Sequence, residues 1–225
     1  MPTAVEKEKK VYKPLMDLMQ RYKVKLSFIS PILGSAPADK AVYEKYVASK
    51  KPEATPEEIQ QETALIPDLP PDSELGRMIF RVDPDTKNII FLPHQIRGFM
   101  KEAASAVTGK GELSAFRSKI DRFVFIFPQD KIPIMKDGNP IQQPDGTNER
   151  PLRAVTPLGP RVTLVSSDEI GPGATAEFEI GVLPLAQKEV TGDMLSYWFQ
   201  YGQLQGISQW RNGGYGRFTF TLEEQ

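Results

Sequence analysis

Cysteine is absent from this chain, and histidine occurs only once, as His94. The lack of cysteine excludes disulfides, thiolate metal sites and cysteine nucleophiles, and it favours a reducing, cytoplasmic environment. With one histidine and no cysteine, only carboxylates remain as further metal ligands. We therefore predict no metal site.

Long hydrophobic runs are also absent. No apolar stretch approaches the roughly 18 residues that a membrane-spanning helix needs, so we expect no contact with a membrane. The first residues, from Met1 to Lys13, are charged and no apolar run follows them. This is not the pattern of a signal peptide.

Recognisable catalytic and nucleotide-binding motifs are missing as well. No phosphate-binding GxxxxGK[ST] motif occurs, and Gly109-Lys110-Gly111 lacks the rest of a dinucleotide fingerprint. The loop from Asp83 to Asn88 lacks the glycine and the glutamate of a calcium loop. Nothing near His94 marks a partner nucleophile. We therefore predict no catalytic residue, no cofactor and no enzymatic activity.

The composition is that of a globular protein. Of 225 residues, 40% are hydrophobic and 25% are charged, which suits one large domain with a real core. A net charge of −1 weighs against binding a polyanion. The charge is uneven, however, because positions 7–25 are rich in lysine and arginine, whereas positions 53–74 are acidic. The acidic stretch can thus hide a basic face from the total.

Hydrophobic periodicity predicts a regular order of elements, interrupted by proline-rich segments. In chain order these are strand 23–29, a short helix at 41–49, hairpin strands 77–82 and 89–92, a helix from Pro93 to Val107 that Gly109 ends, strands 122–127, 162–165 and 174–183, a helix capped by Thr191, and strand 217–222.

This order predicts an α+β fold. We interpret residues 1–225 as a single domain, with core segments at about 23–29, 76–127 and 160–222 and two long insertions at about 30–75 and 128–160. Without the insertions the order is βαββαβ, a ferredoxin-like core with an antiparallel sheet. RNA-recognition (RRM) modules share this arrangement, although a fold alone does not establish a function.

The first segment with a functional signal runs from Ile90 to Ala104. A strand enters a helix through Pro93, and Arg97 and Lys101 follow within the first turns, off the apolar stripe. Free amides and the positive dipole end of a helix favour phosphate oxygens, and Arg97 can add a bidentate contact. The alternative is a capped amphipathic helix whose charges face solvent.

The second segment runs from Leu204 to Phe218. Its glycines permit positive φ angles and the close approach of another backbone. Arg211 and Arg217 bracket these glycines, and Tyr215 offers a face on which a base could stack. The alternative is a turn with incidental arginines.

Together the two segments resemble the RAMP superfamily, the RNA-binding proteins of CRISPR effector complexes. Its members show a (Y/F)IPGSS(L/I)(K/R)G segment before the first helix and a glycine-rich loop near the C-terminus. Here residues 91–98 read Phe-Leu-Pro-His-Gln-Ile-Arg-Gly, and residues 206–218 fit the second pattern. The likeness spans residues 23–222, and its two loose motifs occur in the right order.

The resemblance implies a subunit that binds a single-stranded guide RNA without reading its sequence, forms a homo-oligomer along it, and joins other subunits of an effector complex. Inserted hairpins of such subunits reach over the neighbouring copy. The RNA-binding residues that we predict are Lys25, Arg97, Lys101, Arg211, Asn212, Gly213, Gly214, Tyr215 and Arg217.

The chain also departs from the family pattern. His94 and Gln95 replace a small Gly-Ser pair, which puts close phosphate approach there in doubt. Some members cut RNA with an aspartate after the first strand, but no motif identifies Asp39 as that residue. Two alternatives stay open: an endoribonuclease that uses His94 or a carboxylate, and a stand-alone structural or decoy module that docks on such a complex.

Overall fold

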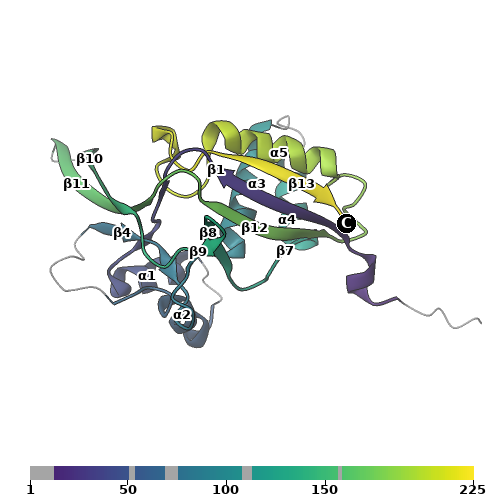
Figure 1. The fold of residues 1–225 in the computed structure, drawn as a ribbon, viewed down its shortest axis with the longest axis horizontal. Helices are drawn as coiled ribbons and strands as arrows, with labels where there is room; N and C mark the ends of the chain where they lie inside the picture. The colour runs from purple at the N-terminus through teal and green to yellow at the C-terminus, as the bar shows by residue number, and fades with distance from the viewer. Residues whose placement is uncertain (1–12, 51–53, 69–75, 108–112, 157–158) are drawn as a thin grey trace, which may run out of the picture.

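The computed structural model describes residues 13–50, 54–68, 76–107, 113–156 and 159–225. They form a mixed α+β fold, as the sequence predicts, but the strands make two sheets instead of the one expected (Figure 1). The predicted helix end at Gly109 and the basic positions before Lys13 lie outside these ranges.

The main sheet is antiparallel throughout, and β1 (Gln20–Phe28) is the second strand from one edge. β1 pairs on one side with β13 (Phe218–Glu224) and on the other with β12 (Thr175–Val182). The outer edge of β12 is shared by two strands, β7 (Val124–Phe127) and β8 (Ile132–Lys136). Short strands extend the sheet beyond β8: β9 (Asn139–Pro140), β6 (Ile89–Phe91) and β5 (Arg81–Val82).

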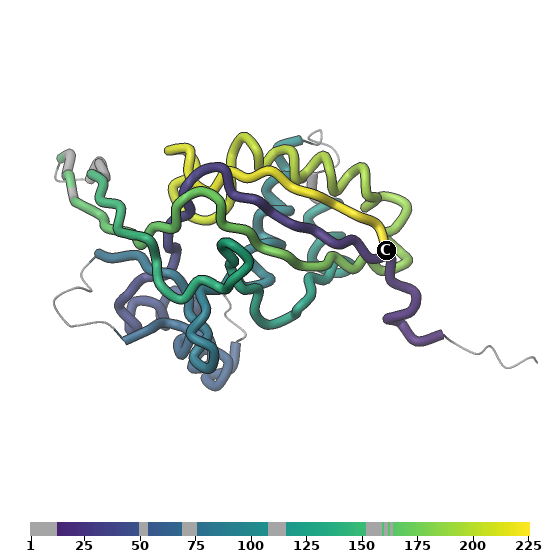
Figure 2. The backbone as a smooth tube through the Cα atoms, viewed as in Figure 1, coloured from purple at the N-terminus to yellow at the C-terminus, as the bar shows by residue number. Residues whose placement is uncertain are grey.

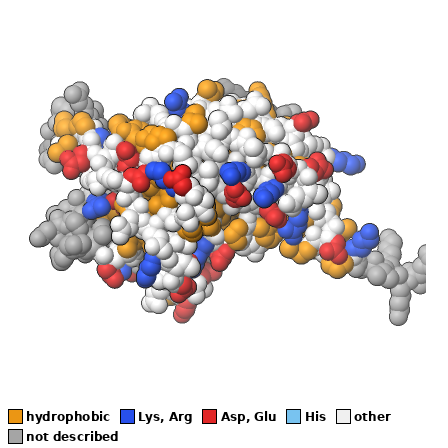
Figure 3. Space-filling view, viewed as in Figure 1, with side chains coloured by type: hydrophobic (Ala, Val, Ile, Leu, Met, Phe, Trp, Pro, Cys, Tyr) orange, Lys and Arg blue, Asp and Glu red, His pale blue; other side chains and the backbone are white. Residues whose placement is uncertain are grey.

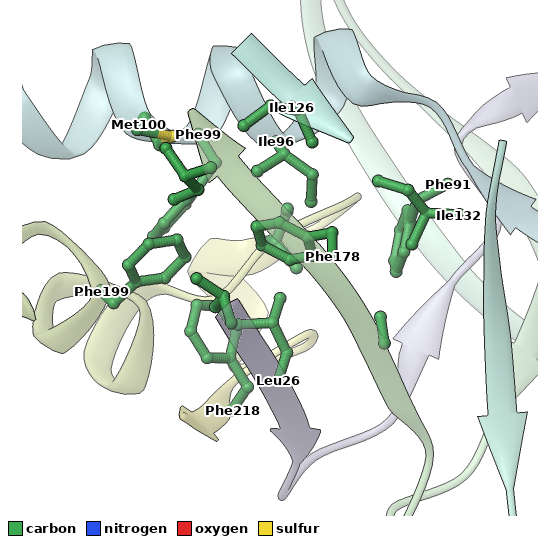
Figure 4. Close-up of a cluster of buried hydrophobic side chains, with 14 of the residues drawn as sticks. Leu26, Phe91, Ile96, Phe99, Met100, Ile126, Ile132, Phe178, Phe199 and Phe218 are labelled. Atoms are coloured by element: carbon green, nitrogen blue, oxygen red, sulfur yellow. The ribbon is translucent and has the colours of Figure 1, made fainter. Parts of the chain in front are cut away.

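Three helices cover one face of this sheet: α3 (Pro93–Val107), α4 (Leu113–Phe123) and α5 (Gly192–Gln205). The predicted stripe of α3 is buried, and the Thr191 hydroxyl caps α5 by accepting from the amide of Met194 at 3.3 Å. Aromatic side chains of the sheet and the helices interlock between the layers, with Phe199 against Phe178 and Phe218 (Figure 4). This core fixes the ends of β1 and β13, from which the candidate site is built.

A second, smaller sheet lies beside the first. Its strands are β10 (Gly146–Thr156), β11 (Gly159–Ile170), β4 (Arg77–Ile79), β3 (Ala36–Pro37) and β2 (Ile32–Leu33). β10 and β11 form a long hairpin that extends away from the main body (Figure 2). The helices α1 (Lys40–Lys50) and α2 (Pro56–Thr63) lie below this sheet in the view of Figure 1.

Several elements differ from the sequence interpretation, including α2 and β8, which lie in the two segments interpreted as insertions. Helix α4 was not predicted, although Phe116 and Ile120 lie four positions apart and are both buried, and Phe123 at its end was assigned to a strand. The β10–β11 hairpin replaces a predicted loop and one short strand. The sequence did not predict this hairpin because Pro151 argues against a strand. β10 is an edge strand, however, and proline is tolerated there.

No helix in the described ranges combines the length and the apolar character that crossing a membrane requires.

Candidate nucleic-acid interface

The predicted glycine-rich segment forms a compact loop, residues 206–217, called here the glycine loop. Its two ends cross closely, with the amide of Ile207 donating to the carbonyl of Gly216 at 2.9 Å. Gly206 and Gly216 have φ angles of 75° and 70°, and a Cβ on either would collide with the backbone of the other end. The glycines therefore serve the crossing of the loop with itself.

The glycine loop is fastened to the segment that follows β1. The amide of Gly216 donates to the carbonyl of Pro31, and the amide of Arg217 donates to the hydroxyl of Ser30, both at 2.7 Å. The hydroxyl of Ser208 donates to the carbonyl of Leu33, also at 2.7 Å. These bonds hold the loop at the end of the main sheet, where the side chains of Asn212 and Arg217 are exposed.

The aromatic residues of the loop are already engaged. Trp210 and Tyr215 stack with ring centres 5.1 Å apart and planes 21° apart, and the Tyr215 hydroxyl bonds to the Asn148 amide group at 3.0 Å. One face of Tyr215 is therefore covered, whereas Trp210 keeps 38% of its surface exposed. Base stacking on Tyr215 stays a prediction, limited to its remaining face.

Three of the five predicted cations lie in ion pairs. Arg211 meets Glu102 at 2.7 Å, Lys101 meets Asp121 at 2.8 Å, and Lys25 meets Glu177 at 3.0 Å. Arg217 makes no ion pair with any other described residue. Among the described residues, Arg217 is thus the cation of the glycine loop that no carboxylate neutralises.

Lys25 also lies apart from the other predicted residues. It is on the face of the main sheet opposite the helices, since its neighbours Val24 and Leu26 are buried in the helix-facing core. Acidic partners accompany the basic residues of β1 on this face, and Arg21 meets Glu179 at 3.0 Å. Figure 3 shows blue and red side chains interspersed there. The open face is therefore electrically balanced and not a cationic platform.

Arg97 lines a cavity of about 790 Å³ at the start of α3. Helix α2 and residues 129–131 close the other sides. Glu62 contributes a largely buried carboxylate, with its Oε1 4.0 Å from Nε2 of His94, and Lys131 contributes a second cation. Acidic side chains of the first insertion thus stand where the resemblance places an RNA phosphate.

Gln95 explains the departure from the family pattern at this junction. Its Oε1 accepts from the amide of Leu92 at 2.8 Å, and its Nε2 donates to the hydroxyl of Ser35 at 3.3 Å. The side chain therefore caps its own helix and occupies an amide that a small residue would leave open.

The remaining acidic candidates have structural partners. Asp39 caps α1, because its Oδ1 accepts from the amides of Ala41 at 2.9 Å and Val42 at 3.2 Å. Asp83 accepts from Lys131 at 2.5 Å and from the hydroxyl of Thr86 at 2.6 Å, and these bonds lower its pKa to about 2. Across the described ranges, no three histidine or acidic side chains gather as metal ligands.

Sequence reasoning missed the residues behind the glycine loop. Asn148 and Arg150 of β10 contact Tyr215 and Trp210, the latter with its guanidinium 4.6 Å from the ring centre. No sequence signal marks either residue, because they lie in a segment interpreted as an irregular insertion. Trp210 itself stands beside Arg211 in the glycine-rich segment, and its position was the available clue.

Comparison with known proteins gives a likeness of fold. No protein-family model matches the chain, and no curated protein matches it in sequence. The fold is similar to a chain in the "Cryo-EM structure of the Type III-B Cmr-beta bound to cognate target RNA", with a TM-score of 0.50 and 12% identity. The match covers 92% of this chain and 61% of the other, so this chain spans about three fifths of that chain's length.

Proposed function

We propose that this chain is an RNA-binding subunit of a cytoplasmic multi-subunit ribonucleoprotein of the RAMP type and does no chemistry of its own. The observation that carries the proposal is the likeness of fold over 92% of the chain to a component of an RNA-bound Cmr-beta structure. The glycine-rich segment and the segment entering α3, each at its expected place along the chain, support it independently.

The core of this subunit would be ferredoxin-like. In favour of this, the four strands β1, β7, β12 and β13 stand in the order β13–β1–β12–β7, with α3 and α4 connecting β1 to β7 and α5 connecting β12 to β13. Leaving the insertions aside, this is the βαββαβ succession of RNA-recognition modules.

We infer that RNA is bound by its backbone along the glycine loop. Arg217 and Asn212 are exposed there, and the turn at Gly213 and Gly214 has no long side chain to keep a phosphate away. Arg211, Lys101 and Lys25 can contribute only by exchanging a carboxylate for a phosphate. Binding of this kind does not depend on base identity.

The β10–β11 hairpin is the element that we assign to contact with a neighbouring copy along the guide RNA. It exposes two apolar side chains two positions apart on one strand, Val162 at 63% and Leu164 at 69%. Apolar groups on a projecting hairpin are typical of surfaces that another chain covers.

Titration of the purified protein with single-stranded RNA at low and moderate salt, followed by size-exclusion chromatography, tests the proposal. Affinity should fall as salt rises, since phosphate contacts release counterions, and longer RNA should carry more copies. Absence of binding at both salt concentrations would end it.

A second candidate function, endoribonuclease activity, is favoured by the cavity at α3. His94, Glu62, Arg97 and Lys131 meet there, and such groups can move a proton and stabilise a phosphorane-like charge. Incubation of labelled RNA with the protein and with His94→Ala discriminates, because cleavage lost on substitution would replace the non-catalytic proposal.

A further inference from the structure

The β10–β11 hairpin and the glycine loop meet at one small junction. On the hairpin side stand Asn148 and Arg150, two positions apart and on the same face of β10. On the loop side stand Trp210 and Tyr215, stacked on each other. The guanidinium of Arg150 lies 4.6 Å from the Trp210 ring centre, and Asn148 bonds to the Tyr215 hydroxyl at 3.0 Å. Arg150 therefore contacts Trp210, and Asn148 contacts Tyr215, across the junction.

Arg150 is an unusual residue for this position. It is only 3% exposed, and within the described ranges it has no carboxylate partner, only the hydroxyl of Ser167 at 3.1 Å. Burial lowers the pKa of its guanidinium. A desolvated cation interacts more strongly with an aromatic face than an exposed one, so the nearby ring of Trp210 helps to stabilise this charge. The position of the Trp210 ring thus affects how well the buried guanidinium of Arg150 is stabilised.

The junction lies where the hairpin leaves the body. β4 anchors β11 through the pairs of Ser166 with Arg77 and of Ser167 with Met78. Arg150 pairs with Val165, the first position beyond this anchor. Further out, the described residues 151–156 and 159–164, the hairpin arm, pair only with each other. A contact at Arg150 therefore acts at the base of the hairpin arm, where a small change in angle moves the far end of the arm the most.

Trp210 packs closely against the rest of the glycine loop, so a movement of its ring would also move the loop. Its φ angle is 54°, and the Cα of Gly213 lies so close to its ring that an added Cβ would be 2.9 Å from Cδ2. The hydrogen bonds of the junction are incomplete, because Arg150 Nε, Asn148 Oδ1 and Gln209 Oε1 have no partner in the described structure. These unsatisfied buried groups cost free energy in the present arrangement, so a ligand on the loop can shift the junction towards another arrangement.

We propose that Arg150 is a positioning residue that couples the glycine loop to the hairpin arm, so that RNA held by the loop fixes the direction of the arm. The inference rests on the proposed RNA binding and adds to it an order of assembly, in which the guide RNA prepares each copy to receive its neighbour. Coupling of this kind is reciprocal, so docking of the arm tightens RNA binding by the same factor.

Amide hydrogen exchange of the full-length protein tests the coupling, with a single-stranded RNA too short to hold two copies. In the wild type, RNA should slow exchange in the glycine loop and in the hairpin arm. In Arg150→Ala, RNA should still slow the loop, but the arm should exchange several-fold faster and no longer respond. Trp210→Phe keeps an aromatic face for Arg150 and should retain the response.

Arg117→Ala is the matched control, since Arg117 is an exposed arginine on α4 away from the junction. Asn148→Ala, a milder change at the junction, should weaken the response in the same direction if Arg150→Ala does not fold. Equal protection of the arm in Arg150→Ala and in the wild type overturns the inference, as does a wild-type arm that ignores RNA bound to the loop.

Failure of the proposed function has a different signature. RNA would then protect neither the loop nor the arm of the wild type. The contact between Arg150 and the glycine loop can still be tested without RNA. Arg150→Ala alone should speed amide exchange in the hairpin arm. Equal exchange rates in Arg150→Ala and Arg117→Ala would refute the link between this contact and the arm.

Discussion

Arg211 of the glycine loop and Glu102 of α3 form an ion pair at 2.7 Å, although 109 positions separate them in the chain. The same carboxylate group lies 3.4 Å from the hydroxyl of Tyr201 on α5. One acidic residue therefore ties the glycine loop to two helices. It also neutralises an arginine whose place in the sequence indicates a phosphate contact.

Releasing this arginine should strengthen RNA binding. We expect Glu102→Gln to raise affinity about two- to fivefold, in line with the roughly 0.5–1 kcal/mol of a solvent-accessible ion pair. Filter binding at low salt measures the change. Glu179→Gln is the control, because it releases Arg21, which lies on the balanced face of the sheet and is not a predicted RNA-binding residue, and it should leave affinity unchanged. Weaker binding by Glu102→Gln would show that the pair positions the loop for RNA.

Arg217 should be the most sensitive cation of the loop. The side chain of Arg217 is exposed and has no ion pair with any residue in the described ranges. Arg217→Ala should therefore weaken RNA binding by about 1 kcal/mol and reduce the dependence of log K on log salt by about one unit. Lys25→Ala should have a much smaller effect, and the exposed Arg117→Ala none. An unchanged salt slope in Arg217→Ala would place the RNA elsewhere.

The pKa of Asp83 predicts a loss of stability in acid. Hydrogen bonds from Lys131 and Thr86 lower this pKa from 3.8 to about 2. A folded-state pKa below the unfolded one stabilises the protein above the unfolded value, and the contribution is lost as the pH falls from about 4 to about 2. Denaturant unfolding of wild type and Asp83→Asn at about pH 5 and pH 3 measures it, and the difference between the two proteins should shrink at the lower pH.

Two glycines in helices should respond to alanine in opposite directions. On α3, Gly98 has open space around it, so Gly98→Ala should stabilise the protein by about 0.5–1 kcal/mol through helix propensity. On α5, a Cβ at Gly202 would collide with the fully buried ring of Phe218, so Gly202→Ala should destabilise it by about 1–3 kcal/mol. Thermal unfolding checks both, and a stabilised Gly202→Ala would mean that this ring can move.

Local sequence patterns were sufficient to predict an element where its hydrophobic residues recur with the period of a helix or a strand. The start of α3 at Pro93 and its buried face, from Ile96 to Ala104, follow from proline geometry and a 3.6-residue period. The strands around Val24 and Phe178 follow from alternation. Helix α4 carried a similar signal in Phe116 and Ile120 and was missed because the strand-like run after it was extended backward over Phe123.

The β10–β11 hairpin and the contacts of the glycine loop had no such local signal. Pro151 reads as a strand breaker until one knows that β10 is an edge strand. The composition around Arg150 indicates a loop, and nothing near it predicts that its guanidinium lies against Trp210, on a segment much further along the chain.

The sequence by itself determined the α+β class, the order of the core elements and the places of the two basic, glycine-bearing segments, because periodicity, capping and turn chemistry act over a few neighbouring residues. Only the tertiary structure decided which charges remain available. Arg211, Lys101 and Lys25 each meet a carboxylate from a distant element, whereas Arg217 meets none among the residues that the structure describes. Electrostatic pairing depends on distance in space, and local patterns do not contain that distance.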